Sequence, residues 1–130
     1  TTAQSVADNA PVVFNSPTTP PPIFNATGTP DIVLTENGSY LVNFQVSVAT
    51  GGGGEWAIAV NGAVTVPLTY TNRSGDSQVF GTAIISVTTA PVILTLVNFS
   101  GGAVTLANGL ASPTKVGTST SASVTIVKLN

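Results

Sequence analysis

The sequence contains no cysteine, no histidine and no methionine. Without cysteine there is no disulfide bond, no thiolate metal ligand and no thiol nucleophile. Without histidine, the side chain that most often acts as a general base near neutral pH is missing. The many serine and threonine hydroxyls have no evident activator in the sequence. We therefore expect a protein that is not an enzyme and that uses no cofactor.

Carboxylates are also scarce and lie far apart along the chain, at Asp8, Asp31, Glu36, Glu55 and Asp76. A glycosidase needs two of them on either side of a sugar bond, and this scatter makes that activity a remote alternative. Calcium needs several clustered oxygen ligands. Only Asp76, with Asn72 and Ser74 nearby, offers a local group, which we interpret as a solvated loop. No metal site is predicted.

Charge of either sign is rare, since only 6% of the residues are Asp, Glu, Lys or Arg, against about 25% in ordinary soluble domains. Arg73, Lys115 and Lys128 are the only basic residues. Binding to nucleic acid or to an anionic membrane surface requires a cluster of cations, so neither partner is expected. No apolar run reaches the roughly 18 residues of a membrane-spanning helix. The hydrophobic fraction is nevertheless 42%, which favours an oligomer that buries part of each chain's surface.

The apolar residues follow the two-residue period of β-strands. In residues 40–48, one face carries Tyr40, Val42, Phe44, Val46 and Val48, and the other carries Leu41, Asn43, Gln45 and Ser47. Asn61-Gly62 is a strong hairpin signal, and Asn37-Gly38 marks a further turn. No segment keeps a 3.6-residue apolar period, so no helix is predicted. About ten short strands between turns indicate an all-β sandwich or barrel.

The first thirty residues are rich in proline and threonine and hold two short apolar segments. Proline cannot donate to a β-ladder, so we interpret the segments around Phe14 and Phe24 as edge strands, and a flexible tail is the alternative. Residues 1–10 are expected to be an N-terminal lead-in, and residues 11–130 a single domain.

Two of the predicted strands are apolar on both faces. In residues 79–87, Phe80 and Ile84 oppose a face made of Val79, Ala83, Ile85 and Val87. In the last strand, Val124 and Ile126 oppose Val127 and Leu129. A strand that is apolar on both faces is normally buried on both. We expect one face to pack inside the sandwich and the other against a second chain.

Several segments resemble a known family. Gly38–Ser47 (GSYLVNFQVS) is similar to the Gly-x-Tyr-x-Val/Phe-x-Phe strand of the complement-q and tumour-necrosis-factor-like jelly rolls. Phe14-Asn15 and Phe24-Asn25 lie where that family has its first two short strands, and residues 121–129 resemble its last strand. The resemblance covers the chain from about Pro11 to Leu129 and implies a trimeric jelly roll, whose inner sheet includes the first, third, sixth and last strands.

Within this family, the chain most resembles the C-terminal domain of collagen-like glycoproteins on Bacillus spores. Residues 61–67 (NGAVTVP) and the Ser-Ala-Ser sequence at residues 121–123 carry this likeness. Vertebrate members usually have Gly-Asp where Ala90-Pro91 stands here, which weakens a direct complement-like reading. The likeness implies a structural homotrimer on a spore or cell surface, in the exosporium, that caps and nucleates a collagen-like stalk. The chain has no Gly-X-Y repeat, so such a stalk would precede Thr1.

The residues expected in the trimer interface or the core are all apolar: Tyr40, Val42, Phe44, Phe80, Ile84, Val124, Ile126, Val127 and Leu129. The alternative function is an adhesion module that binds a carbohydrate or a host protein through surface loops, with Tyr70, Asn72, Arg73 and Asp76 as its candidate residues. Trp56 with Tyr40 or Tyr70 could form a sugar-stacking platform, but we expect Trp56 and Tyr40 in the core. Four Asn-x-Ser/Thr patterns, at Asn25, Asn37, Asn72 and Asn98, carry no weight in a chain so rich in these residues.

Overall fold

The computed structural model describes residues 4–15, 19–48, 54–72, 78–107 and 122–130, with the backbone alone at residues 65–72. This part of the chain contains strands and turns and no helix. The strands are β1 (Ser5–Val6), β2 (Ile23–Phe24), β3 (Ile32–Leu34), β4 (Gly38–Ser47), β5 (Gly54–Val60), β6 (Ala63–Asn72), β7 (Gln78–Val87), β8 (Val92–Asn98), β9 (Val104–Thr105) and β10 (Ala122–Lys128). The prediction of an all-β chain with about ten short strands is confirmed.

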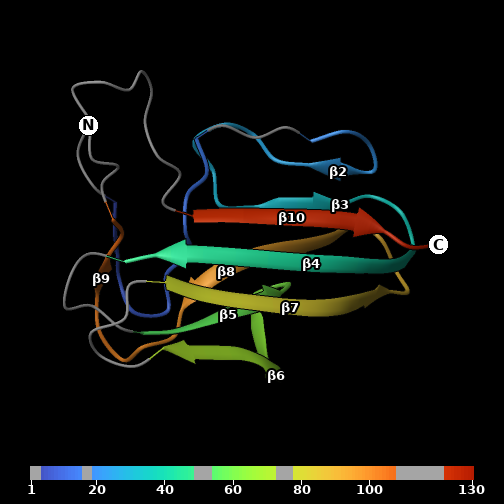
Figure 1. Ribbon diagram of the computed structural model, residues 1–130. Coiled ribbons are helices and arrows are strands. Elements are labelled where there is room, and N and C mark those ends of the chain that lie inside the picture. The colour runs from blue at the N-terminus through green and yellow to red at the C-terminus, as the bar shows by residue number, and fades with distance from the viewer. Residues whose placement is uncertain (1–3, 16–18, 49–53, 73–77, 108–121) are drawn as a thin grey trace, which may run out of the picture.

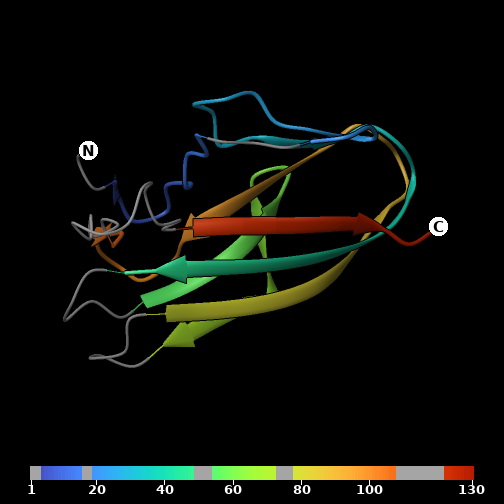
Figure 2. The ribbon, with the colours of Figure 1, turned by 45° about the horizontal axis from the view of Figure 1, so that its top comes forward.

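Two antiparallel sheets face each other as layers of a sandwich (Figures 1 and 2). One sheet has three strands in the order β10-β4-β7, and the other has five in the order β2-β3-β8-β5-β6. The short β1 and β9 form a separate pair. The resemblance implied a sheet that includes both the first and the last strand. The last strand, β10, does lie in the three-stranded sheet, whereas β1 pairs with β9 instead.

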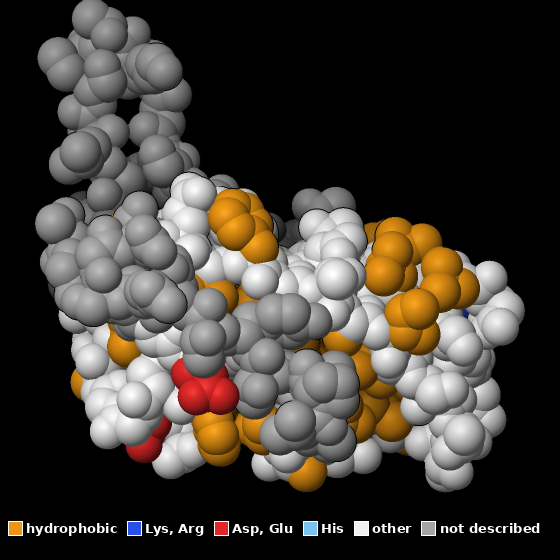
Figure 3. Space-filling model, turned by 60° about the horizontal axis from the view of Figure 1, so that its bottom comes forward, with side chains coloured by type: hydrophobic (Ala, Val, Ile, Leu, Met, Phe, Trp, Pro, Cys, Tyr) orange, Lys and Arg blue, Asp and Glu red, His pale blue; other side chains and the backbone are white. Residues whose placement is uncertain are grey.

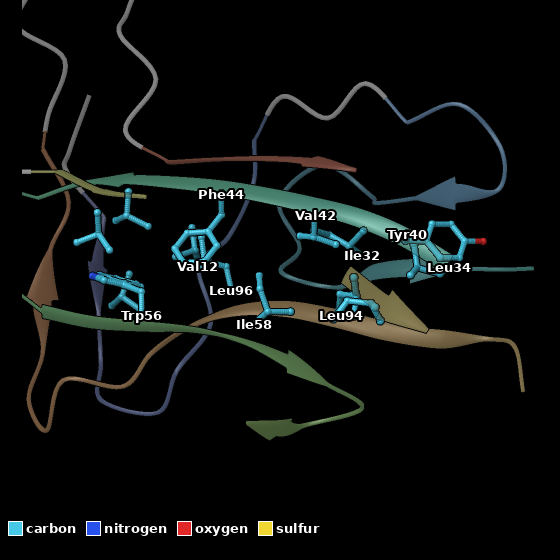
Figure 4. Packing of buried hydrophobic residues seen from close by; sticks show 14 of the residues in the cluster. Val12, Ile32, Leu34, Tyr40, Val42, Phe44, Trp56, Ile58, Leu94 and Leu96 are labelled. Carbon is cyan, nitrogen blue, oxygen red and sulfur yellow. The ribbon is translucent and has the colours of Figure 1, made fainter. Parts of the chain in front are cut away.

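The core fills the space between the layers, and β4 contributes the longest row of side chains to it (Figure 4). Its inward residues Tyr40, Val42, Phe44 and Val46 are all exposed by 3% or less, which confirms the alternation predicted from the sequence. Residues of the opposite layer, including Ile58, Leu94 and Leu96, pack beneath them. Each buried aliphatic or aromatic side chain stabilises the fold by roughly 1.5–3 kcal/mol.

The two Asn-Gly turns have different roles. Asn61-Gly62 closes a two-residue hairpin, because Val60 pairs with Ala63. Its φ values of 50° and 84° are both positive, as a type I′ turn requires, so this prediction is confirmed. Asn37-Gly38 closes no hairpin: β3 pairs with β2 and β8, while β4 pairs with β10 and β7. This turn carries the chain from one sheet to the other.

The N-terminal residues pack closely on the sandwich. Val6 is 2% exposed and Val12 is 1% exposed. The first predicted edge strand is reduced to isolated bridges at Pro11 and Phe14, whereas the second is present as β2 at the edge of its sheet. We interpret these segments as edge strands because Phe14 and Phe24 would be poor side chains to leave in water, yet Phe24 is 56% exposed. In an edge strand of two residues, one of the pair points to solvent.

Candidate functional site

The outer face of the three-stranded sheet is the candidate site. Because β4 turns Tyr40 and Val42 inward, it turns Leu41 outward. Leu41 is in register with Ile84 on β7 and with Val127 on β10, so three apolar side chains form one row across the sheet. Leu129 lies beside this row and Phe80 lies further along β7, opposite Gln45. We call Leu41, Phe80, Ile84, Val127 and Leu129 the association face.

Four of these five side chains are strongly exposed in the single chain: Phe80 by 61%, Ile84 by 64%, and Val127 and Leu129 each by 50%. Leu41 is half-buried. Hydrophobic side chains reach the surface in several groups in Figure 3, with acidic side chains at one end of that view. Single exposed apolar residues are ordinary, but a group of them on one sheet face marks an interaction surface.

Polar but uncharged side chains fill the middle of this outer face. Asn43 is in register with Thr82 and Thr125, and Gln45 is in register with Ser123. No described residue that points outward from β4, β7 or β10 is Asp, Glu, Lys or Arg. Charge repulsion therefore does not oppose the approach of a second copy to this face.

The predicted interface and core residues separate into three groups. Tyr40, Val42 and Phe44 belong to the core. Val124 and Ile126 are half-buried on the inner side of β10 and pack against that core. Phe80, Ile84, Val127 and Leu129 point outward and are exposed. The predicted division of the two strands into an inner and an outer apolar face is thus confirmed. The occupancy of the outer face by another chain remains a prediction.

The side chains of the four predicted ligand residues, Tyr70, Asn72, Arg73 and Asp76, lie outside the part of the chain that the structure describes. Arg73 and Asp76 lie outside the described residues. Tyr70 and Asn72 contribute their backbone to β6, and their side chains are likewise outside the description.

Trp56 and Tyr40 are both fully buried, with exposures of 0%. They are core residues, as expected, and offer no sugar-stacking platform. The Tyr40 hydroxyl donates to the backbone carbonyl of Glu36 at 2.7 Å, which satisfies its one buried polar group.

Burial also bears on the glycosylation patterns. Asn98 is 0% exposed and Asn25 is 6% exposed, so neither side-chain amide is open to a transferase in the folded chain. The Asn98 amide instead donates to the carbonyls of Val6 at 2.9 Å and Gly102 at 2.8 Å.

Two of the carboxylates, those of Asp8 and Glu36, have structural contacts. Asp8 accepts from the backbone N–H of Gly101 at 2.8 Å and from the amide of Asn9 at 3.1 Å. Glu36 pairs with Lys128 at 3.3 Å. Across the described ranges, no three Asp, Glu, His or Cys residues gather closely enough to hold a metal ion.

Leu41 is the one member of the association face that we did not single out from the sequence. The signal was available, because Leu41 is the apolar residue among the outward positions Asn43, Gln45 and Ser47. Only its register with Ile84 and Val127 shows that it joins them in one row.

No protein-family model matches this chain, and neither does any curated protein. Among the residues that the structure describes, no helix is long and apolar enough to span a membrane.

Proposed function

We propose that this chain is a structural, non-catalytic module that forms a homotrimer through the association face. The exposed apolar row formed by Leu41, Ile84 and Val127 is the observation that carries the proposal. Burying such side chains between copies stabilises an oligomer by roughly 25 cal/mol per Å² of apolar surface removed from water.

Three further features support association between identical chains. The outer face is a continuous antiparallel sheet whose strands are linked by backbone hydrogen bonds, so the backbone that carries its side chains is ordered before contact. Its outward side chains on the described residues are uncharged. Only 6% of the residues in the whole chain are charged. A chain with so few charged residues is better suited to an oligomer, in which neighbouring copies cover part of its surface, than to a monomer.

The proposed topology is a jelly roll. This proposal is supported by the way the chain alternates between the two layers. β3, β5, β6 and β8 lie in the five-stranded sheet, whereas β4, β7 and β10 lie in the three-stranded sheet, so the chain passes from one layer to the other several times. Repeated crossing between two sheets is typical of Greek-key sandwiches, to which the jelly roll belongs. The choice of three copies rests on the resemblance of Gly38–Ser47 to complement-q-like strands.

The same resemblance supports an extracellular position on a bacterial spore or cell surface, at the end of a collagen-like stalk. The lack of histidine and cysteine and the separate structural contacts of Asp8 and Glu36 support a role without catalysis. Sequencing the region that encodes residues before Thr1 tests the stalk. A Gly-X-Y tract there is the expected result, and a different globular domain would contradict it.

Light scattering coupled to gel filtration tests the assembly at micromolar concentration. We expect three times the 13.0 kDa mass of one chain. Ile84→Asp should give a folded monomer, because Ile84 is 64% exposed in the single chain and only assembly would bury the new carboxylate.

Ile93→Asp is the matched control, since Ile93 is an exposed isoleucine on β8 of the other sheet, at 39%. It should remain trimeric. A monomeric parent protein would refute the proposal. So would Ile84→Asp and Ile93→Asp variants that both keep the parent mass.

A further inference from the structure

The outer face of the five-stranded sheet has a groove that the proposed assembly does not use. The two outward residues at the middle of β5 are Ala57 and Ala59, which are in register with Val97 and Thr95 on β8. Both alanines point away from the core, and they are only 0% and 2% exposed. A groove of about 470 Å³ runs over Ala59, Thr95 and Val97. We call it the alanine groove.

The walls of the alanine groove come from distant parts of the chain. Phe99, which follows β8 and is 41% exposed, lines one side. Asn9 and Pro11 line another. This N-terminal wall is tied to β8 by backbone hydrogen bonds from Asn9 N to Asn98 O at 2.8 Å and from Asn98 N to Ala10 O at 3.0 Å. The wall therefore belongs to the sheet, and the groove is largely pre-formed.

The polar groups of the groove are neutral. Among the described residues that line it are Asn9, with its amide, and Thr95, with its hydroxyl, and none of these described lining residues is Asp, Glu, Lys or Arg. The Asn9 amide is oriented by its hydrogen bond to Asp8 at 3.1 Å. An anionic ligand would lose its hydration here without gaining a counter-charge, because the described lining contains no Lys or Arg and the neighbouring Asp8 is itself an acid. A purely apolar ligand would displace water from the Asn9 side-chain carbonyl oxygen and the Thr95 hydroxyl without offering either a hydrogen bond.

A short saccharide meets these conditions. Its C–H face can stack on an aromatic ring such as Phe99, and its hydroxyls can both donate to and accept from an amide and a hydroxyl. A volume of about 470 Å³ lies within the usual range for small-ligand sites. We propose that the alanine groove binds a neutral saccharide of a few rings.

This site is independent of the proposed trimer. The groove lies over β5 and β8 of the five-stranded sheet, and the association face belongs to β4, β7 and β10 of the other sheet. Figure 2 shows these two sheets as separate layers. A trimer would thus present its grooves away from the contacts between its chains, and a monomer would keep the same site.

Titration of ¹⁵N-labelled protein with chitotriose and, separately, maltotriose tests the proposal by NMR. We expect at least one of these neutral trisaccharides to cause saturable shifts of the backbone amides of Asn9, Ala59, Thr95 and Phe99. Phe99→Ala should weaken binding by about 10-fold, the upper range for a stacked ring. Thr95→Val, which keeps the side-chain shape, should weaken it by about 2- to 12-fold.

Thr125→Val is the matched control, because Thr125 is an exposed threonine on the opposite sheet, and it should leave the affinity unchanged. The spectra of the free variants verify that each is folded. The proposal is overturned if neither saccharide gives saturable shifts at 20 mM, a concentration well above the roughly 1 mM of weak specific binding. Shifts that persist unchanged in both Phe99→Ala and Thr95→Val would overturn it equally.

Discussion

Replacement of Asn98 by alanine should be among the most damaging single changes in this chain. Asn98 ends β8 in full burial, where its side chain makes three backbone hydrogen bonds of 3.0 Å or less. Its amide donates to Val6 O at 2.9 Å and Gly102 O at 2.8 Å, and its carbonyl accepts from Ser100 N at 3.0 Å. The residue thus connects the N-terminal segment to the turn after β8.

The expected loss follows from these contacts. Each hydrogen bond contributes about 1 kcal/mol net, and each buried partner left unsatisfied costs a further 1–3 kcal/mol. Partial relaxation will let water reach some of the freed groups, so we expect a loss of about 3–5 kcal/mol in the free energy of unfolding. Asn98→Asp should cost at least as much, because it places a carboxylate oxygen against the carbonyls of Val6 and Gly102. A domain of this size has about 5–15 kcal/mol in total.

Urea denaturation followed by fluorescence measures the effect. Trp56 is the single tryptophan of the chain and is fully buried, so its emission reports unfolding, with far-ultraviolet circular dichroism as a second probe. The variants are compared in the Ile84→Asp background at one protein concentration, so that subunit dissociation does not enter the result.

Asn15→Ala is the control, since Asn15 is exposed and its loss should change stability by less than about 0.5 kcal/mol. A loss below about 1 kcal/mol for Asn98→Ala would show that the three hydrogen bonds contribute little beyond what water replaces, and the reasoning would be refuted.

Three further changes have defined outcomes. Gly38→Ala should lower the free energy of unfolding by about 1–3 kcal/mol, because the φ of Gly38 is +145° and a new Cβ would collide with the carbonyl oxygen of Asn130. Gly102→Ala is the control in the same denaturation assay, because the position of its new Cβ has no atom within 4 Å. Gly62→Ala should cost only about 1–2 kcal/mol, since φ is +84° but no atom lies within 4 Å, and a cost equal to that of a core truncation would contradict this. Val124→Asp should destabilise the fold, because the side chain of Val124 packs against the core. Thr125→Asp, on the outer face of β10, should instead reduce the assembled mass measured by light scattering. Equal effects of the two variants on stability would contradict the assignment of Val124 to the inner face of β10 and Thr125 to its outer face.

Much of the candidate association face could be predicted from the sequence. The alternation in residues 79–87 and in the last strand places Phe80, Ile84, Val127 and Leu129 opposite the core residues, because successive side chains of a strand point to opposite sides whatever it pairs with. The alanine groove could not be predicted. Ala57 and Ala59 look like ordinary small strand residues, and the contributions of Asn9 and Pro11 become visible only when the N-terminal segment lies along β8.

By itself, the sequence determined the positions of the longer strands, their inner and outer faces, and the hairpin at Asn61-Gly62, all of which depend on the conformation of a few neighbouring residues. Only the tertiary structure decided the pairing of β10 with β4, the change of sheet at Asn37-Gly38 and the burial of Asn98. The physical reason is that every strand edge presents the same N–H and C=O groups. The choice of partner and register is therefore made by the packing of side chains that lie far apart in the chain.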